Sequence, residues 1–529
     1  MQEEVYAIGE PHYDPLMRTF LLLFTLFLVS CCSRTNRLEH HDNNTIVRIA
    51  DAEARGLDPQ TVSELVSIRI ASDQFEGLTR FNAAGNAEPG LAKEWTISPD
   101  GKVWTFHLRP GLVFSDRHPI DAQVFVDALA RIRADKTGSP HVSLFAIINR
   151  IEAPDPATVV VRLTDPFPQL PALLAHPALA ALPFHIIAAK GDAWTSDRPM
   201  VTSGPYRLVR WQLNQALTLA ANPFWHDGKP ASPTVIWRPI ENRLTAMRLI
   251  LSGGADTSSD FPDNRQAWLS ENYPRFMHVT PYLGTYYFVF NTRRPPFDDV
   301  RVRRALSMAV DRKWMTDKMI AAGNEPAWGL LPPSLSGGKA WRPIWASWTR
   351  EQRLNDARRL LAQAGYGPGH RLAFDIRFNS SSEHRRAAVA MASMWRELGV
   401  EARMLNSEAS LHFDSMKRGD FDMARSGWIA DLPAPENFLA VHRSDAGPQN
   451  YSGYANPAYD AALKTALAEP DSAHRLAKMQ KAGEILLDDA PLIPLYFYVN
   501  RVLISPQLRG WKDNDSNMHP SRTLYRVAA

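Results

Sequence analysis

Cysteine is almost absent from this chain of 529 residues, because the only two are the adjacent Cys31 and Cys32. The sequence that follows them contains no thiol, which excludes a structural disulfide or a cysteine-ligated metal site there. Long apolar runs are scarce as well. After residue 35 no stretch stays apolar and uncharged for the roughly 20 residues that a membrane-spanning helix needs. We therefore expect the body of the chain to fold in water.

Motifs of the common enzyme classes are also missing. There is no Gly-x-Ser-x-Gly, no His-Glu-x-x-His and no phosphate-cradling Gly-Lys-Ser/Thr loop. The formal net charge is only +3 and the basic residues form no long block, which does not favour nucleic acid as a partner. We expect a protein that is not an enzyme and uses no cofactor or metal. Carboxylates distant in sequence could still meet, so a secreted peptidase or hydrolase stays an alternative.

An export pattern stands near the N-terminus. Met17 and Arg18 precede an apolar run over residues 20–30. A positive start, a short apolar run and a small residue before the cut are typical of a secretory signal peptide, and the run is too short for a normal membrane-spanning helix. We therefore assign residues 1–30 to a signal region. Residues 1–16 are acidic and lack this pattern, which favours Met17 as the true start.

The end of the apolar run, Leu-Val-Ser-Cys at 28–31, resembles the lipobox of bacterial lipoproteins. The resemblance implies that Cys31 is lipidated and becomes the new N-terminus. A plain signal peptide cut near Ser30, or an uncleaved anchor, is the alternative. Residues 31–45 are then the lipidated cysteine and a polar tether, in which His40 and His41 fit a linker better than a metal site.

Hydrophobic periodicity predicts alternating strands and helices. The clearest unit is a strand at 372–378, a helix at 383–398 that ends at Gly399, and a strand at 400–405. Strand, helix and strand within about 35 residues form a βαβ unit, which indicates a parallel sheet. Two α/β lobes that face each other would form a ligand cleft between them. Further strands are predicted at 46–50, 103–109, 158–163 and 491–504, and further helices at 121–133, 299–319, 355–364 and 475–487.

Asp431 stands in an unusual place for a charge. It follows the apolar residues Trp428, Ile429 and Ala430 and precedes a proline-containing loop at 432–435. A buried charge is costly unless a partner neutralises it, and a cationic ligand would be such a partner. The alternative is an ordinary loop aspartate that caps a turn or pairs with an arginine of the chain.

A series of ordered segments along residues 46–525 has a recognisable pattern: Phe75–Leu78, Lys102–Arg109, Asn222–Trp225, Pro281–Tyr287, Pro295–Arg303 and Phe421–Asp431, followed by Phe438 and Leu439. These segments resemble the oligopeptide-binding proteins of bacterial ABC importers, the extracellular solute-binding family 5. The oligopeptide branch is more similar than the dipeptide, nickel or haem branches.

This resemblance implies an α/β fold of the two-lobed periplasmic-binding-protein type, with a hinge and an extra inserted domain. Lobe I would comprise residues 46–75, 199–283 and 498–529, and the inserted domain II residues 76–198. Lobe II, also called domain III, would comprise residues 284–497. The ligand would be enclosed when the lobes close about the hinge.

The resemblance also implies a role for each site residue. Asp431 aligns with the aspartate that pairs with the α-ammonium of a peptide. Arg425 and His384 align with positions that serve the peptide's C-terminal carboxylate, directly or through water. Tyr287 lies in the aromatic segment of the cleft. His141 replaces a tyrosine that helps to hold the ammonium in close relatives, and a charged histidine would sit poorly beside an ammonium.

The residues themselves leave alternatives open for three of these positions. Tyr287 would fit the core equally well, His384 starts a helix where a surface role is common, and Arg425 could pair within the chain. The backbone at 428–430 is expected to pair with the peptide as an added strand. Met416 and Ala409 replace a basic and an aromatic residue that the family pattern leads one to expect.

The function that the resemblance implies is a monomeric substrate-binding lipoprotein of the periplasm, attached to the membrane through its lipid only. It would capture oligopeptides by their backbone and termini and deliver them to the permease of an ABC importer. The alternative keeps the fold and changes the ligand to a cell-wall peptide, another small solute or a signalling peptide.

Overall fold

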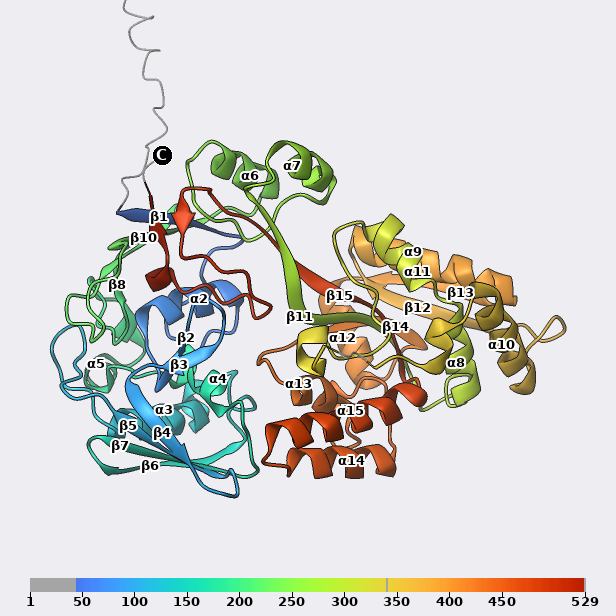
Figure 1. The fold of residues 1–529 in the computed structure, drawn as a ribbon, viewed down its shortest axis with the longest axis horizontal. Coiled ribbons are helices and arrows are strands. Elements are labelled where there is room, and N and C mark those ends of the chain that lie inside the picture. The colour runs from blue at the N-terminus through green and yellow to red at the C-terminus, as the bar shows by residue number, and fades with distance from the viewer. Residues whose placement is uncertain (1–43, 339–340, 528–529) are drawn as a thin grey trace, which may run out of the picture.

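The computed structural model describes residues 44–338 and 341–527. The predicted signal region, the start at Met17 and the lipidation of Cys31 lie outside these ranges. Within them the chain forms two halves connected by two long strands (Figure 1). No helix among the described residues is long and apolar enough to cross a membrane.

The first half is built on a mixed four-stranded sheet in the order β1-β10-β9-β8. β1 runs parallel to β10, and the other pairs are antiparallel. Apolar side chains fill both faces of this sheet, with α2 on one side and α6 on the other. The elements are β1 (Thr45–Ala50), α2 (Leu65–Gln74), β8 (Tyr206–Gln212), β9 (Ala216–Ala221), β10 (Thr234–Pro239), α6 (Arg243–Leu251) and α7 (Gln266–Asn272).

A second, antiparallel sheet in the order β4-β5-β7-β6 packs against α3 around its own core in the same half. Asp121 accepts a hydrogen bond from the backbone N–H of Gln123 and so starts α3, as predicted. The elements are β2 (Thr79–Phe81), β3 (Ala87–Pro89), β4 (Ala92–Ile97), β5 (Val103–Leu108), α3 (Gln123–Arg133), β6 (Ile148–Asp155), β7 (Thr158–Leu163), α4 (Leu170–Leu174) and α5 (Phe184–Lys190).

The second half contains a five-stranded sheet in the order β13-β12-β14-β11-β15. One face packs against α8, α10 and α11, and the other against α12 to α15. The strands are β11 (Met277–Phe290), β12 (Ala373–Asn379), β13 (Glu401–Ser407), β14 (Met423–Ile429) and β15 (Leu492–Leu503). The helices are α8 (Val300–Ala309), α9 (Arg312–Trp314), α10 (Arg350–Gln363), α11 (Ser382–Trp395), α12 (Ala409–Arg418), α13 (Pro435–Leu439), α14 (Pro457–Leu467) and α15 (Ser472–Asp488).

The predicted βαβ unit is confirmed as β12, α11 and β13. The two strands pair in parallel from Ala373 to Asn379, and Gly399 adopts a positive φ of 75° between helix and strand. The helix predicted over 299–319 is interrupted, because Val310 is extended and Asp311 caps a new turn through the N–H of Trp314.

β11 and β15 connect the halves. Their outer parts, where Met277 pairs with Leu503, pack with β1 and α6 of the first half. Their inner parts, where Phe288 pairs with Ile493, lie in the second sheet. The pairing shifts register between Pro281 and Thr285, in the stretch that passes from one half to the other. Two strands that pass between halves in this way provide a hinge. A short sheet of β16 (Leu508–Arg509) and β17 (Tyr525–Arg526) follows.

A buried ion pair holds α13 against α15. Arg475 donates to the carboxylate of Glu436 at 2.8 Å, and these residues are only 3% and 7% exposed. We expect Glu436→Ala to lower the free energy of unfolding by about 3 kcal/mol, because a buried guanidinium would lose its counter-charge. Urea denaturation measures this loss.

Glu397→Ala is the matched control for this substitution. Glu397 also pairs with an arginine, Arg350, but both side chains are exposed. Exposed pairs contribute less than about 1 kcal/mol, so a similar loss in both variants would contradict the importance of burial.

Candidate functional site

A cavity of about 730 Å³ lies between the two halves, within the size range of ligand sites. Its walls come from α2, from the domain of the second sheet, from the end of β14 with α13, and from the C-terminal segment at 516–518. Residues far apart in sequence therefore share one space. Among the predicted site residues, the cavity is lined by His141, Trp428, Ile429, Ala430 and Asp431.

The loop after β14 holds Asp431 at the cavity wall. The N–H of Ala430 donates to the Leu283 carbonyl of β11 at 2.8 Å, which continues the sheet by one residue. Asn437 of α13 then accepts from the indole N–H of Trp428 at 2.9 Å and from the backbone N–H of Asp431 at 3.2 Å. These bonds fix the backbone that leads into Asp431.

Asp431 has no cationic partner in the part of the chain that the structure describes: no Lys, Arg or His lies within ion-pair distance. Its side chain is exposed to the cavity, yet the cavity walls displace part of the surrounding water. This desolvation raises the pKa of Asp431, although the Asn437 amide and the field of His141 act in the opposite direction. The carboxylate is thus held in a place where a cation would stabilise it.

His141 lies across the cavity, in the first half. Its side chain is 7% exposed, and its Nε2 lies 2.8 Å from the carbonyl oxygen of Val62. Burial lowers the pKa of His141 by more than the Val62 carbonyl and Asp431 raise it. His176 packs edge-on at 4.8 Å, and burial lowers its pKa to about 3. His141 is therefore a neutral group at neutral pH, and the repulsion that a charged histidine would exert on an ammonium is absent.

One edge of β14 has no partner strand near the cavity. β12 pairs with β14 only at Met423 and Ala424, and no other described strand covers that edge from Ser426 to Ile429. The opposite edge is fully paired with β11. An unpaired strand edge beside a cavity can accept an extended peptide as a further strand.

Arg425 and His384 lie together on β14 and α11, but neither lines the cavity. Arg425 donates to the hydroxyl of Tyr498 at 2.9 Å and stacks over the ring of Tyr286 at 4.7 Å. The Tyr286 hydroxyl lies 3.1 Å from Nδ1 of His384. Burial, followed by the charge of Arg425, lowers the pKa of His384 to about 3. No carboxylate pairs with Arg425 among the described residues.

Two glycines make room for this cluster. A Cβ on Gly427 would lie 2.7 Å from the Tyr498 hydroxyl, and one on Gly284 would lie 2.6 Å from the ring of Tyr498. The ring therefore packs directly on the backbone of β11 and β14. A side chain at either position would displace Tyr498 from Arg425.

Tyr287 lies in the core of the second half. It is 3% exposed, packs with the apolar residues around α13 to α15 and contacts His442 edge-on at 6.3 Å. Alternation along β11 places its neighbour Tyr286 on the opposite face, with Arg425. The structure thus brings Tyr286 and Tyr498 to the position beside Arg425.

Known proteins resemble this chain over most of its length. The sequence model of the bacterial extracellular solute-binding proteins, family 5, matches residues 86–450. This chain belongs to that family. A relative, the periplasmic oligopeptide-binding protein OppA of Escherichia coli K12, is 35% identical over 92% of this chain and 93% of its own length.

Solved structures share the fold of this solute-binding protein. The unliganded open form of the murein tripeptide-binding protein MppA superposes with a TM-score of 0.82, at 33% identity, over 92% of this chain and 98% of that one. Haemophilus influenzae OppA, in complex with the peptide RPPGFSPFR, has a TM-score of 0.76 at 30% identity, over 92% and 100%. The predicted two-lobed periplasmic-binding-protein fold is confirmed, and the relatives are solute-binding proteins, not enzymes.

Sequence reasoning missed several residues of the site. Asn437, Tyr282 and Arg69 line the same cavity. Asn437 follows Asp431 by six positions, and nothing in that spacing signals a bond between them. Tyr282 lies in the family-like segment Pro281–Tyr287, but the resemblance implies no role for this residue. In the described residues, no group of three or more His, Cys, Asp or Glu side chains could hold a metal ion.

The desolvated carboxylate predicts a pH-dependent cost in stability. Because the pKa of Asp431 is raised in the fold, ionisation of this group opposes folding above its ordinary pKa of 3.8. Below that pH both states hold the proton and the cost vanishes. We expect Asp431→Asn to raise the melting temperature of the peptide-free protein slightly at pH 7, and not below about pH 4.

Differential scanning calorimetry at the two pH values measures this effect. Asp192→Asn, at an exposed surface carboxylate, is the control and should change neither value. A lower melting temperature for Asp431→Asn at pH 7 would show that Asp431 has a stabilising partner within the chain.

Proposed function

We propose that this solute-binding protein captures oligopeptides in the cavity between its lobes and delivers them to the permease of an ABC importer. Every peptide has the same backbone donors and acceptors and two opposite terminal charges. A site that satisfies these groups, and leaves side chains in open space, tolerates many sequences. The protein therefore recognises the backbone and the two charged termini of the ligand.

The observation that carries the proposal is the unpaired Asp431 beside an unpaired strand edge. The α-ammonium of a peptide supplies the missing cation, and its backbone supplies the missing hydrogen bonds for Trp428, Ile429 and Ala430. Neutral His141 faces the ammonium without repelling it. Closure of the lobes lowers the dielectric constant around Asp431, so the charge pair strengthens as the ligand is enclosed.

The C-terminal carboxylate of the ligand is assigned to Arg425, whose guanidinium has no carboxylate partner among the described residues. Arg425 does not line the cavity in this structure, so this contact belongs to the closed arrangement of the lobes. Neutral His384 can add a hydrogen bond beside it. Arg425 and Asp431 are six residues apart, and six steps of an extended chain span about 20 Å. A peptide that reaches both groups therefore has only a few residues. In this proposal Tyr287 has a packing role.

The relatives support a peptide ligand, since OppA of E. coli is named for oligopeptides and the H. influenzae structure holds a peptide. The likeness to MppA, named for murein tripeptide, favours a cell-wall peptide as the second candidate. Native mass spectrometry of the purified protein separates the two. A single defined mass, in place of a ladder of peptides, would favour the cell-wall ligand.

The domain limits are part of the proposal. Residues 46–75, 199–283 and 498–529 form lobe I, 76–198 the inserted domain II, and 284–497 lobe II. In this division β11 and β15 carry the hinge, and the cavity receives residues from all three parts. The ligand then stabilises the closed arrangement by bridging His141 and Asp431.

A free N-terminus is the decisive feature of the proposed ligand. We expect unmodified tripeptides to raise the melting temperature of the protein more than their N-acetylated forms. We expect Asp431→Ala to weaken binding of the unmodified peptides by about 10²–10³-fold, since one partner of an enclosed charge pair is lost. Isothermal titration calorimetry measures this change.

Asp192→Ala is the control and should bind as the unaltered protein does. Equal affinity for acetylated and unmodified peptides would refute the role of Asp431.

We also propose that the protein is a periplasmic, monomeric lipoprotein, held at the membrane through lipid on Cys31. One acyl chain binds membranes weakly, so stable attachment requires more than one. We expect Cys31→Ser to shift the protein from the membrane fraction to the soluble periplasmic fraction, as measured by fractionation and immunoblotting. Cys32→Ser should remain with the membrane, and retention of both variants would refute the lipid on Cys31.

A further inference from the structure

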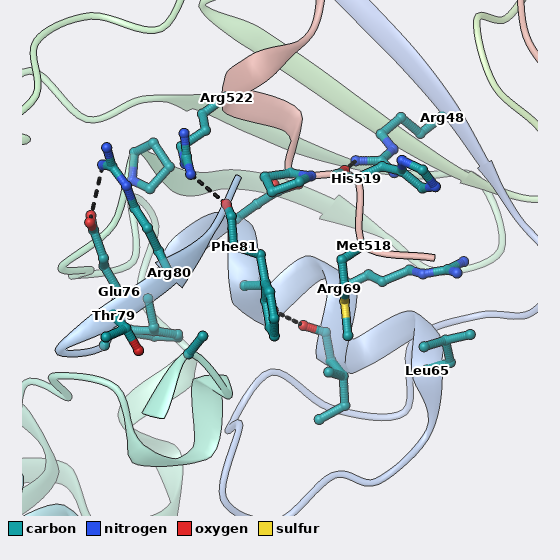
Figure 2. Close-up of a pocket in the computed structure, with 18 residues that line it drawn as sticks. Arg48, Leu65, Arg69, Glu76, Thr79, Arg80, Phe81, Met518, His519 and Arg522 are labelled. Carbon is teal, nitrogen blue, oxygen red and sulfur yellow. Dashed lines mark hydrogen bonds and ion pairs between the residues drawn. The ribbon is translucent and has the colours of Figure 1, made fainter. Parts of the chain in front are cut away.

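Arg69 extends from α2 between two cavities. It lines the large cavity between the lobes and also a smaller one of about 60 Å³ within the first half. Figure 2 shows the smaller cavity, where Arg80 is joined to Glu76 and Arg522 to Phe81, while no dashed line joins Arg69 to a neighbour. In the described part of the chain Arg69 forms no ion pair or hydrogen bond through its guanidinium.

The other charged residues of the large cavity differ from Arg69 and Asp431 in this respect. Each has an ion-pair partner within the chain: Asp165 pairs with Lys102, Glu436 with Arg475, and Arg443 with Asp445. Within the described residues, Arg69 and Asp431 are thus the two charges of this cavity without one. Arg69 belongs to the first half and Asp431 to the second, so the two halves present opposite unpaired charges.

Tyr282 connects the two charges electrostatically. It lies on β11 between the halves, and after burial the positive charge of Arg69 and the negative charge of Asp431 act on its pKa in opposite directions. Burial lowers the pKa of Arg69, while Tyr282 and Asp51 raise it less. Asp51 is the acidic group in range, but it lies beyond ion-pair distance. The Arg69 guanidinium is therefore partly desolvated and, like the Asp431 carboxylate, has no ion-pair partner among the described residues.

We propose that Arg69 binds the carboxylate of an acidic side chain in the ligand, so that this protein prefers peptides with Asp or Glu near the N-terminus. This inference rests on the proposed peptide ligand and on Asp431 as the ammonium anchor. A guanidinium holds a carboxylate through two parallel hydrogen bonds, which a neutral amide cannot reproduce.

The geometry favours a side-chain carboxylate over the C-terminal one. Arg425 already offers a guanidinium for the C-terminal carboxylate. It lies six residues from Asp431 in the same half of the molecule, whereas Arg69 lies in the other half. Arg69 lines the same cavity as Asp431 and Tyr282, whereas Arg425 does not line it, so Arg69 is placed at the ammonium end of the ligand. The smaller cavity has room only for a few water molecules, so the carboxylate has to enter from the large cavity.

The test compares two tripeptide series that differ only in charge. Ala-Ala-Ala is altered to Glu or to Gln at each position in turn, and affinities are measured by isothermal titration calorimetry with protein freed of bound peptide. We expect Glu at the first or second position to bind about tenfold more tightly than Gln there. Arg69→Gln should abolish this difference, so that the Glu and Gln peptides bind the variant equally.

Arg443→Gln is the matched control, because Arg443 lines the same cavity but is already paired with Asp445; it should keep the preference for Glu. Equal binding of Glu and Gln peptides, or a preference that survives in Arg69→Gln, would overturn the inference and leave the peptide function intact. If C-terminal amidation weakens binding to the unaltered protein but not to Arg69→Gln, Arg69 binds the terminus, which also overturns it. If none of the peptides binds, the proposed function and this inference fall together.

Discussion

A charge that has no counter-charge among the described residues is the constraint on which this site depends. The backbone N–H of Ala430 donates to the Leu283 carbonyl of β11, and that of Asp431 donates to the Asn437 side chain of α13. These bonds keep the Asp431 carboxylate where water is partly displaced. The protein bears this cost when no ligand is bound, and a cation that enters the cavity would remove it. The neighbouring pair of Glu436 and Arg475 shows the opposite arrangement, in which the chain neutralises its own charges.

The missing counter-charge of Asp431 also explains why two lobes suit this site, because a ligand can bring a partner from the other half. His141 and Arg69 lie in the first half, Asp431 and the unpaired edge of β14 in the second, and β11 and β15 are the strands that pass between them. A ligand that contacts both halves favours their approach, since its contacts are complete only in the closed form. The neutral state of His141 follows from its burial against Val62, and it removes the conflict that a histidine beside an ammonium would otherwise bring.

Much of the fold could be predicted from local pattern. The strand at Val103–Leu108, the unit of β12, α11 and β13, and the cap at Asp121 all depend on periodicity or on a single capping residue. The prediction of one helix over 299–319 was only partly right, because Asp311 starts a new turn within that range. The family resemblance predicted the two lobes and the role of Asp431. Only the three-dimensional structure shows which residues surround Asp431. Tyr286 and Tyr287 are neighbours in the sequence, and only the register of β11 against β14 shows that Tyr286 is the one that faces Arg425.

The sequence by itself determined the class of the protein, the order of its elements and the chemistry of a short apolar run that is followed by an aspartate. These properties follow from residues that are neighbours in the chain. The tertiary structure decided which charges are paired. Glu436 and Arg475 are 39 residues apart and neutralise each other, whereas Arg69 and Asp431, from opposite halves, share a cavity and have no counter-charge among the described residues. Pairing depends on distances of a few ångströms between distant segments, and a one-dimensional pattern does not contain those distances.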